Sequence, residues 1–157
     1  MNDAEVLDKL AGMGLELPPV PEPLASYVPV VVTGTTAIVS GQVPMRGGDL
    51  VHPGKLGSSV NVEEGSEAAR WAAVQGLAAL RAAVGTFDRL VRIVQLTVYV
   101  ASEPDFFEQP RVANGASDLL VAVLGDAGRH ARAAVGVTAL PLGSSVEVAI
   151  VAEIAPA

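Results

Sequence analysis

The sequence predicts an α+β fold in a single domain, with two long helices packed on one face of a mixed, mainly antiparallel sheet. Three observations lead to this expectation. A chain of 157 residues that is 50% hydrophobic can fill one sizeable core, and two domains would be crowded. The hydrophobic periodicity changes along the chain in the order ββαβαββ. The last strand alternates strictly, so that one of its faces meets the helices.

The first segment is expected to be a short helix followed by a spacer. Residues Asp3 to Gly12 gather apolar side chains on one side, with a polar cap before them and glycines after them. The proline-rich run Pro18 to Pro23 favours an extended polyproline conformation. We therefore place a boundary near Leu24, with residues 1–23 as an appended helix and spacer and residues 24–157 as the domain.

Two strands should follow and pair antiparallel. They are predicted at Val28 to Val32 and at Thr36 to Val43, and the glycine between them allows a tight hairpin turn. Gly41 lies inside the second strand, which indicates a bulge or a place where another group, such as a ligand, approaches the backbone closely. The pair Gly47-Gly48 predicts a further turn.

Two long helices are predicted next. The spacing of apolar residues indicates a helix from Val62 to Val84, which Asn61 can cap and Gly85 can end. A second helix is predicted from Pro110, a favourable first-turn residue, to Leu124, where a glycine follows. Trp71 has the spacing of a core residue of the first of these helices.

The remaining three segments read as strands, at Leu90 to Ala101, Ala133 to Val137 and Val146 to Ile154. In the last of them the row expected to face the helices is Val146, Val148, Ile150, Ala152 and Ile154. The opposite face then combines an apolar set with a polar one, namely Val91, Ile93, Ala149 and Val151 with Gln95, Thr97, Tyr99 and Glu147. Such a face is too apolar for water and too polar for a sealed core, and it suits a subunit interface that contains a site.

Composition excludes several classes of protein. Without cysteine there are no disulfides, no thiolate catalysis and no cysteine-based metal site. A net charge of -7, scattered Lys and Arg, and 4% aromatic residues disfavour nucleic-acid binding. No apolar run of about 18 residues is free of charges and turn signals, so we expect no membrane span. The acidic N-terminus does not resemble a secretory signal, and we expect a cytoplasmic protein.

Other short motifs point to no established site. His52 and His130 lack companions at metal-ligand spacing, so no metal is expected. The two Gly-Ser-Ser runs do not form the G-x-S-x-G motif of serine hydrolases. Gly54-Lys55 lacks the glycine and the hydroxyl residue that a phosphate-binding loop requires around it.

A set of motifs in fixed order carries a family resemblance. They are Tyr27, the run GTTAIVSGQVP at 34–44, a long helix, a strand, ARAAV at 131–135, and then LP at 140–141 and VE at 146–147. From Tyr27 to Ile154 the chain therefore resembles the RidA/YjgF family, the reactive-intermediate deaminases, as a longer-branch member. The resemblance implies a chorismate-mutase-like α+β domain and a homotrimer. In such a trimer the sheets form an inner barrel and the sites lie between subunits.

The resemblance also implies roles for individual residues. Arg132 would hold the carboxylate of a 2-imino or enamine acid, and Glu147 would position or activate the hydrolytic water. The expected activity is that of a 2-iminobutanoate/2-iminopropanoate deaminase-like hydrolase, which releases a 2-oxo acid and ammonia without a cofactor. Around these two residues the implied substrate-binding positions are Tyr27, Ser40, Gly41, Asn114 and Ala134. Two departures from the family pattern are Ala133, where serine is common, and Asn114, the nearest counterpart of an asparagine that usually lies closer to the two phenylalanines.

The chemistry agrees with these roles, and alternatives stay open. An arginine fork recognises a planar carboxylate at two points, and an electrophilic imine needs chiefly a placed water and a proton acceptor. Arg132 could instead pair with Glu147 or Glu153 at a subunit contact. The protein could also be a non-catalytic trimeric protein that binds or senses a carboxylate, or a specialised pathway enzyme acting on a larger imine or enamine.

Overall fold

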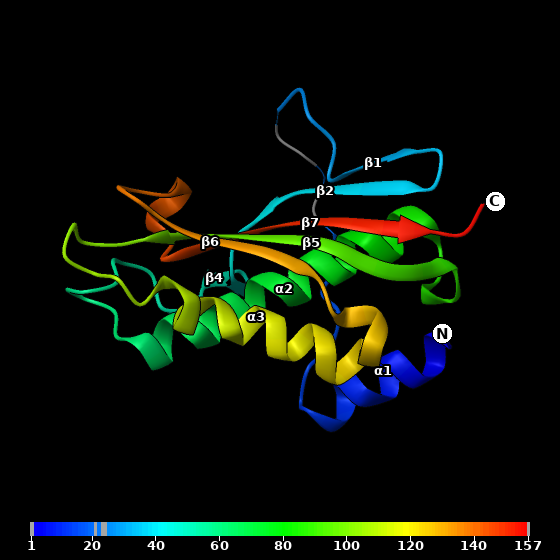
Figure 1. The fold of residues 1–157 in the computed structure, drawn as a ribbon, viewed down its shortest axis with the longest axis horizontal. Helices are drawn as coiled ribbons and strands as arrows, with labels where there is room; N and C mark the ends of the chain where they lie inside the picture. The colour runs from blue at the N-terminus through cyan, green and yellow to red at the C-terminus, as the bar shows by residue number, and fades with distance from the viewer. Residues whose placement is uncertain (1, 21, 23–24, 157) are drawn as a thin grey trace.

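A five-stranded sheet carries all the long helices on one of its faces in the computed structural model, which describes residues 2–20, 22 and 25–156 (Figure 1). The strands lie in the order β1-β2-β7-β5-β6, and only the β5–β6 pair is parallel. Their bounds are β1 Val30–Thr33, β2 Thr36–Gln42, β5 Leu90–Ala101, β6 Ala131–Val137 and β7 Val146–Ile154. The mixed, mainly antiparallel sheet predicted from the sequence is confirmed.

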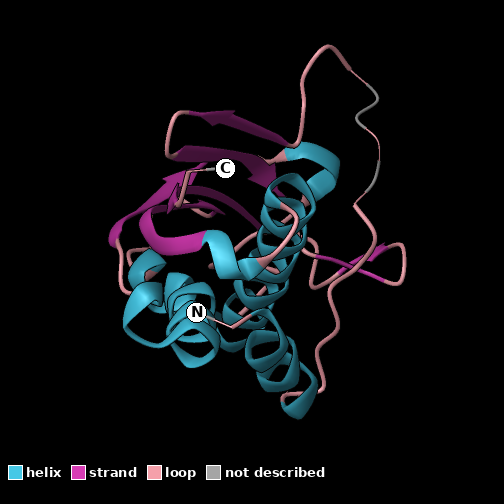
Figure 2. Cartoon of the chain, turned by 90° about the vertical axis from the view of Figure 1, so that its right-hand side faces the viewer, coloured by secondary structure: helices cyan, strands magenta, loops and turns pink. Residues whose placement is uncertain are grey.

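The helices follow the local signals closely. Helix α2 spans Val62–Val84 and begins with a capping box, in which Asn61 and Glu64 each accept a hydrogen bond from the other's backbone N–H. Helix α3 spans Gln109–Leu124, one residue longer than predicted. Figure 2 shows the helices gathered on one side of the sheet. A small hairpin of β3 (Met45–Arg46) and β4 (Asp49–Leu50) surrounds the predicted glycine turn.

Helix α1, Asp3–Gly12, lies against the same core as the rest of the chain. Val6 and Leu10 are fully buried. The carboxylate of Asp3 accepts two hydrogen bonds from Arg81, at 2.9 and 2.8 Å, and a third from the backbone N–H of Phe87. The Arg81 guanidinium therefore lowers the pKa of Asp3. The boundary predicted at Leu24 lies outside the described residues, and the division into 1–23 and 24–157 stays a prediction.

The two faces of the sheet follow the predicted alternation on β7 but not along the whole of β5. All five β7 residues expected to face the helices are buried. On β5 the assignment of Ile93 to the open face was wrong, because Ile93 is fully buried and pairs with Ala152 of the helix-facing row. Two register shifts, between Leu90 and Arg92 and between Ile93 and Gln95, insert extra residues and reset the alternation. Arg92 and Val94, which simple alternation would place toward the helices together with Leu96, are consequently exposed.

No helix in the described ranges combines the length and the apolar character needed to cross a membrane.

Helices α2 and α3 cross closely at Gly115, and this contact yields a stability prediction. A Cβ atom at Gly115 would lie only 2.6 Å from the backbone carbonyl carbon of Ser66, and helix backbone cannot easily move away. We expect Gly115→Ala to lower the free energy of unfolding by about 1–3 kcal/mol, measured by urea denaturation. The matched control is Gly12→Ala in α1, where the added methyl meets nothing within 4 Å. Equal denaturation midpoints for the two variants would contradict the close crossing.

Candidate functional site

Arg132 lies on β6, the edge strand of the sheet, and its side chain is held by α3. Its Nη1 donates to Asn114 Oδ1 at 2.9 Å and to Ser117 Oγ at 3.1 Å. Its Nη2 makes a longer bond of 3.4 Å to the carbonyl oxygen of Pro110. These three acceptors are spaced along one face of the helix, at i, i+4 and i+7. Asn114 lies farther along the chain from the two phenylalanines than the family asparagine does. It nevertheless contacts Arg132, as expected of a residue in the same site.

The guanidinium keeps donors available for a ligand. An arginine has five N–H donors, and the three bonds to α3 leave Nε–H and one N–H of Nη2 without an acceptor in the part of the chain that is described. None of the salt bridges among these residues includes Arg132, so neither Glu147 nor Glu153 of the same chain pairs with it. An exposed arginine held by neutral groups presents a full positive charge to a carboxylate.

Ser117 was not predicted, although it follows Asn114 by one helical turn. Its hydroxyl lies 3.0 Å from Nε2 of His130, and Nδ1 of His130 lies 2.6 Å from the carbonyl oxygen of Gly128. Because a carbonyl only accepts, the network requires the proton on Nδ1. With the proton on Nδ1 alone, Nε2 accepts from the Ser117 hydroxyl, whose oxygen accepts from Arg132. His130 thereby orients Ser117 toward the arginine.

Glu147 lies on β7, beside Tyr99 of β5, on the face away from the helices. It is half-buried, and burial raises the pKa of its carboxyl above the ordinary 4.5. The carboxyl packs against the backbone of Gly41 in β2. A Cβ atom added to Gly41 would lie 2.8 Å from Cδ of Glu147. The predicted bulge is confirmed by the register shift between Val39 and Gln42. The group that approaches this backbone within the chain is the Glu147 carboxyl.

Ser40 precedes Gly41 in β2, and Tyr27 lines the same pocket as Gly41. The hydroxyl of Ser40 donates to the carbonyl oxygen of Val28 at 2.6 Å, and its backbone N–H donates to that of Pro29 at 2.8 Å. Ser40 thus ties β2 to the segment that carries Tyr27. The ring of Tyr27 is 58% exposed and lines, together with Gly41, a pocket of about 410 Å³.

A single chain does not bring Arg132 and Glu147 together. Arg132 is the partner of the fully buried Leu96, so it lies on the helix side of the sheet, whereas Glu147 is the partner of the half-buried Tyr99 on the other side. Ala134 lies two residues along β6 from Arg132, opposite Val98. The predicted residues therefore form two groups. The arginine group is Arg132 and Asn114, with Ala134 nearby and with Ser117 added by the structure, and the glutamate group is Glu147, Gly41, Ser40 and Tyr27.

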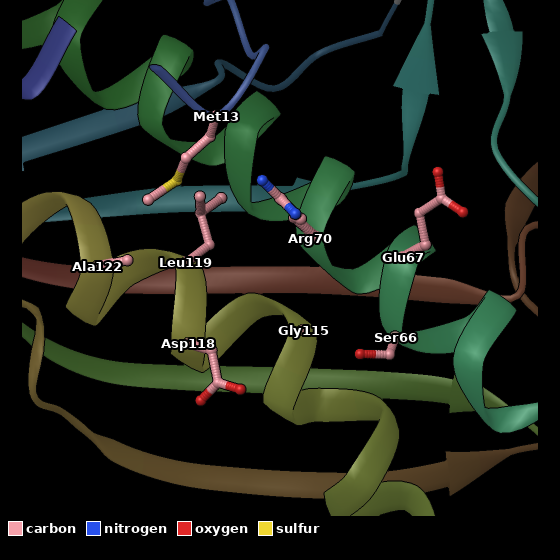
Figure 3. A pocket seen from close by; sticks show the side chains of 8 residues that line it. All are labelled: Met13, Ser66, Glu67, Arg70, Gly115, Asp118, Leu119 and Ala122. Atoms are coloured by element: carbon pink, nitrogen blue, oxygen red, sulfur yellow. The ribbon is translucent and has the colours of Figure 1, made fainter. Parts of the chain in front are cut away.

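A separate groove lies on the outer side of the helix layer, between α2 and α3. It measures about 570 Å³ and is lined by Met13, Ser66, Glu67, Arg70, Gly115, Asp118, Leu119 and Ala122. None of the predicted site residues lines it. In Figure 3 the carboxylates of Glu67 and Asp118 point apart instead of converging on one point. Over residues 2–20, 22 and 25–156, no three His, Asp or Glu side chains gather in a way that could hold a metal ion.

Comparisons with known proteins agree on one family. The family model described as "YjgF/chorismate mutase-like, putative endoribonuclease" matches residues 7–154. Protein TCP17 of Trypanosoma cruzi is 45% identical over 150 residues, which cover 95% of this chain and 94% of that protein. The crystal structure of the protein Atu1372 of Agrobacterium tumefaciens, with unknown function, is 40% identical, with a TM-score of 0.91 over 97% of this chain and 93% of that one.

A third similar structure is named "putative endoribonuclease" and comes from Shewanella oneidensis. It is 36% identical, with a TM-score of 0.90 over 94% of this chain and 98% of that one. A more distant structure, that of Escherichia coli TdcF with bound serine, is 20% identical with a TM-score of 0.61, covers 85% of this chain and 92% of that one, and shows the fold alone.

Proposed function

The chain belongs to the RidA/YjgF family, and from this premise we propose that it hydrolyses 2-imino acids and their enamine tautomers to 2-oxo acids with release of ammonia. The observation that carries the proposal is the geometry of Arg132. Its guanidinium is exposed, is held by three neutral acceptors on α3, and retains two N–H donors with no acidic partner in the described chain. This arrangement suits two-point binding of a substrate carboxylate.

Glu147 supplies the proton acceptor that hydrolysis needs. The carboxylate takes a proton from a water molecule as that water adds to the carbon of the C=N bond, and the carboxyl returns this proton to the imine nitrogen to give the carbinolamine. The same carboxyl then transfers the hydroxyl proton of the carbinolamine to its nitrogen, so that the C–N bond breaks, the C=O bond forms and ammonia leaves. A carboxyl whose pKa is raised by burial both accepts a proton and returns it. The substrate C=N bond is already electrophilic, so a single carboxyl group suffices.

If Arg132 and Glu147 act on one substrate, as proposed, their separation within a chain calls for a second copy. We therefore propose a homotrimer in which Arg132 and Asn114 of one copy face Glu147, Gly41, Ser40 and Tyr27 of the next, with the sheets forming an inner barrel. The face of the sheet away from the helices supports this assembly, because it exposes apolar side chains. Val31 of β1 and Ile38 of β2 are neighbours on this face, and both are exposed. Val135, also exposed, lies beside Tyr99 on the same face.

The activity can be tested directly. An amino-acid oxidase acting on alanine generates 2-iminopropanoate in place, and the appearance of pyruvate is followed with and without the protein. We expect the protein to accelerate this conversion. An unchanged rate, with the oxidase in excess and over a range of pH, would contradict the proposed function. The description of the family model and the name of the Shewanella oneidensis protein also suggest RNA cleavage, and incubation with single-stranded RNA is the matching assay. A net charge of -7 is unfavourable for binding phosphates.

A binding role without turnover is the second candidate, because the Arg132 fork would hold a carboxylate whether or not hydrolysis follows. Tight binding of 2-oxo acids, together with unchanged imine decay, would favour it over hydrolysis.

The raised pKa of Glu147 predicts a pH dependence of the activity. Since the ionised carboxyl is the base, kcat/KM should rise with pH as Glu147 loses its proton, with a midpoint above 4.5. The Glu147→Gln variant should have a low kcat/KM at every pH, and its kcat/KM should not show this rise on the acidic side (the acidic limb). The measurement is kcat/KM after subtraction of the uncatalysed imine decay at each pH. Glu153→Gln, on the exposed end of the same strand, is the control and should keep the limb.

A further inference from the structure

The pocket beside Gly41 has features that the hydrolysis of a small imine does not need. It encloses about 410 Å³ between the N-terminal segment, the end of β2, helix α2 and the loop before β7. The apolar side chains among its lining residues include Val20, Tyr27, Val43, Met45 and Leu142. A 2-imino acid the size of alanine would leave this volume empty of apolar contacts.

The pocket adjoins the proposed base. Gly41 lines it and also supports the Glu147 carboxyl, whose Cδ lies 2.8 Å from where a Cβ of Gly41 would stand. A substrate whose imine carbon lies near Glu147 therefore has one substituent directed to the Arg132 of a neighbouring copy, and the other free to enter the pocket. The position of the pocket thus suits the side chain of the substrate and not its carboxylate.

The polar group on the helix side of the pocket is already engaged. Gln75 of α2 is only 8% exposed, and its Nε2 donates to the carbonyl oxygen of Met45 at 2.8 Å. This bond fixes the backbone of Met45 at the pocket wall. The amide nitrogen therefore does not require a polar ligand. Gln42 also lines the pocket and donates its Nε2 to the carbonyl oxygen of Ser40, which leaves Glu22 as the charged residue in an otherwise largely apolar lining.

Leu142 lies at the rim of the pocket in an unusual conformation. It has a φ of 61°, a left-handed value that is costly for a residue other than glycine, and its side chain is 77% exposed. It belongs to the short 3-10 turn η3, Pro141–Gly143, between β6 and β7, the strands that carry Arg132 and Glu147. An apolar ligand beneath it would remove its side chain from water.

We infer that this pocket receives the side chain of the substrate, and that the preferred substrates are 2-imino acids with extended apolar side chains, with Leu142 as a residue that determines specificity. The inference rests on the proposed function for its substrate class. It depends on the pocket and not on turnover, because the 2-oxo acid products present the same side chain and carboxylate. Binding of these products is therefore the appropriate measurement.

The test is calorimetric titration with straight-chain 2-oxo acids from pyruvate to 2-oxohexanoate. We expect the Kd to fall about fourfold for each added methylene. Leu142→Ser should raise the Kd for 2-oxohexanoate about fivefold and leave the Kd for pyruvate almost unchanged. The reason is that only the longer side chain reaches Leu142 and loses apolar contact area in the variant. Val43→Phe, which fills part of the pocket, should also weaken the binding of 2-oxohexanoate more than that of pyruvate. The control is Phe107→Ser, a comparably exposed phenylalanine (80%) that does not line this pocket.

The outcomes separate this inference from the proposed function. Equal affinity along the series, no binding of 2-oxohexanoate, or a chain-length preference that both Leu142→Ser and Val43→Phe leave unchanged would overturn the inference. A Kd that falls steeply with chain length, less steeply in Leu142→Ser and Val43→Phe but as steeply in Phe107→Ser, would support the inference. If the imine assay then shows no acceleration, hydrolysis is wrong while the pocket stands. Thermal melting of each variant confirms that the fold is retained.

Discussion

Arg132→Ala is expected to lower kcat/KM for 2-imino acid hydrolysis by at least about 100-fold, because a charge-assisted, two-point contact with the substrate carboxylate is lost. Arg132→Lys should recover only part of this loss. A lysine keeps the charge but carries its three N–H donors on one nitrogen, so bonds to Asn114 and Ser117 would leave a single donor for the ligand instead of a planar fork. Initial rates of 2-oxo acid formation from several amino acids, at matched oxidase flux, provide the measurement.

Arg129 offers a matched control for this experiment. It lies three residues from Arg132, is exposed, and pairs at 3.3 Å with the fully exposed Asp126. Arg129→Ala changes the net charge by the same amount and should leave kcat/KM within about twofold, because exposed ion pairs contribute little. If both variants lost kcat/KM by the same factor, the loss would come from the change in net charge and not from a contact of Arg132. An Arg132→Ala variant as fast as the wild type would remove the arginine from the mechanism.

Mixing two inactive variants should restore activity if each site is shared between copies. Arg132→Ala and Glu147→Gln each lack one half of the site, so either homo-oligomer is expected to be slow. In oligomers assembled at random from equal amounts of both, about one interface in four joins an intact arginine group to an intact glutamate group. We therefore expect about a quarter of the wild-type activity from the whole co-expressed mixture. Trimers purified through two different affinity tags should reach about a third, because homotrimers are then absent and one of the three interfaces in each mixed trimer is intact.

The arrangement of the site decides the result of this mixing experiment. If Arg132 and Glu147 acted within one chain, no mixture would contain an intact site and activity would stay at the level of the single variants. Purification through both tags and native mass spectrometry establish that mixed oligomers are present. Mixed oligomers without recovered activity would contradict a shared site. The double variant Arg132→Ala/Glu147→Gln, mixed with either single variant, should stay inactive and controls for partial recovery by assembly alone.

Local signals in the sequence were enough to locate most elements. The bounds of α2 were predicted correctly because a capping box fixes its start and Gly85 follows its end. The alternation of β7 correctly separated the buried row from the row of Glu147. These features depend on residues a few positions apart, and such patterns are visible in a single sequence.

Features that depend on pairing between distant segments could not be predicted in this way. The bulges of β5 arise from its register with β7, and they moved Ile93 to the buried face against simple alternation. Ser117 carries no local mark of its role, which depends on β6 lying beside α3. The placement of Arg132 and Glu147 on opposite faces follows from three paired strands, and no local pattern indicated it; the expectation of a site between subunits came from the family resemblance alone.

The attachment of Arg132 to α3 links substrate recognition to the spacing between helices. The guanidinium is held at three points on one helix, and Gly115, between two of them, sets how closely that helix approaches α2. A substitution that pushes α3 outward would carry the arginine with it. If Arg132 binds a carboxylate as proposed, substitutions between the two helices would change the affinity for that acid without contacting it, and changes made there for thermal tolerance would alter binding as well.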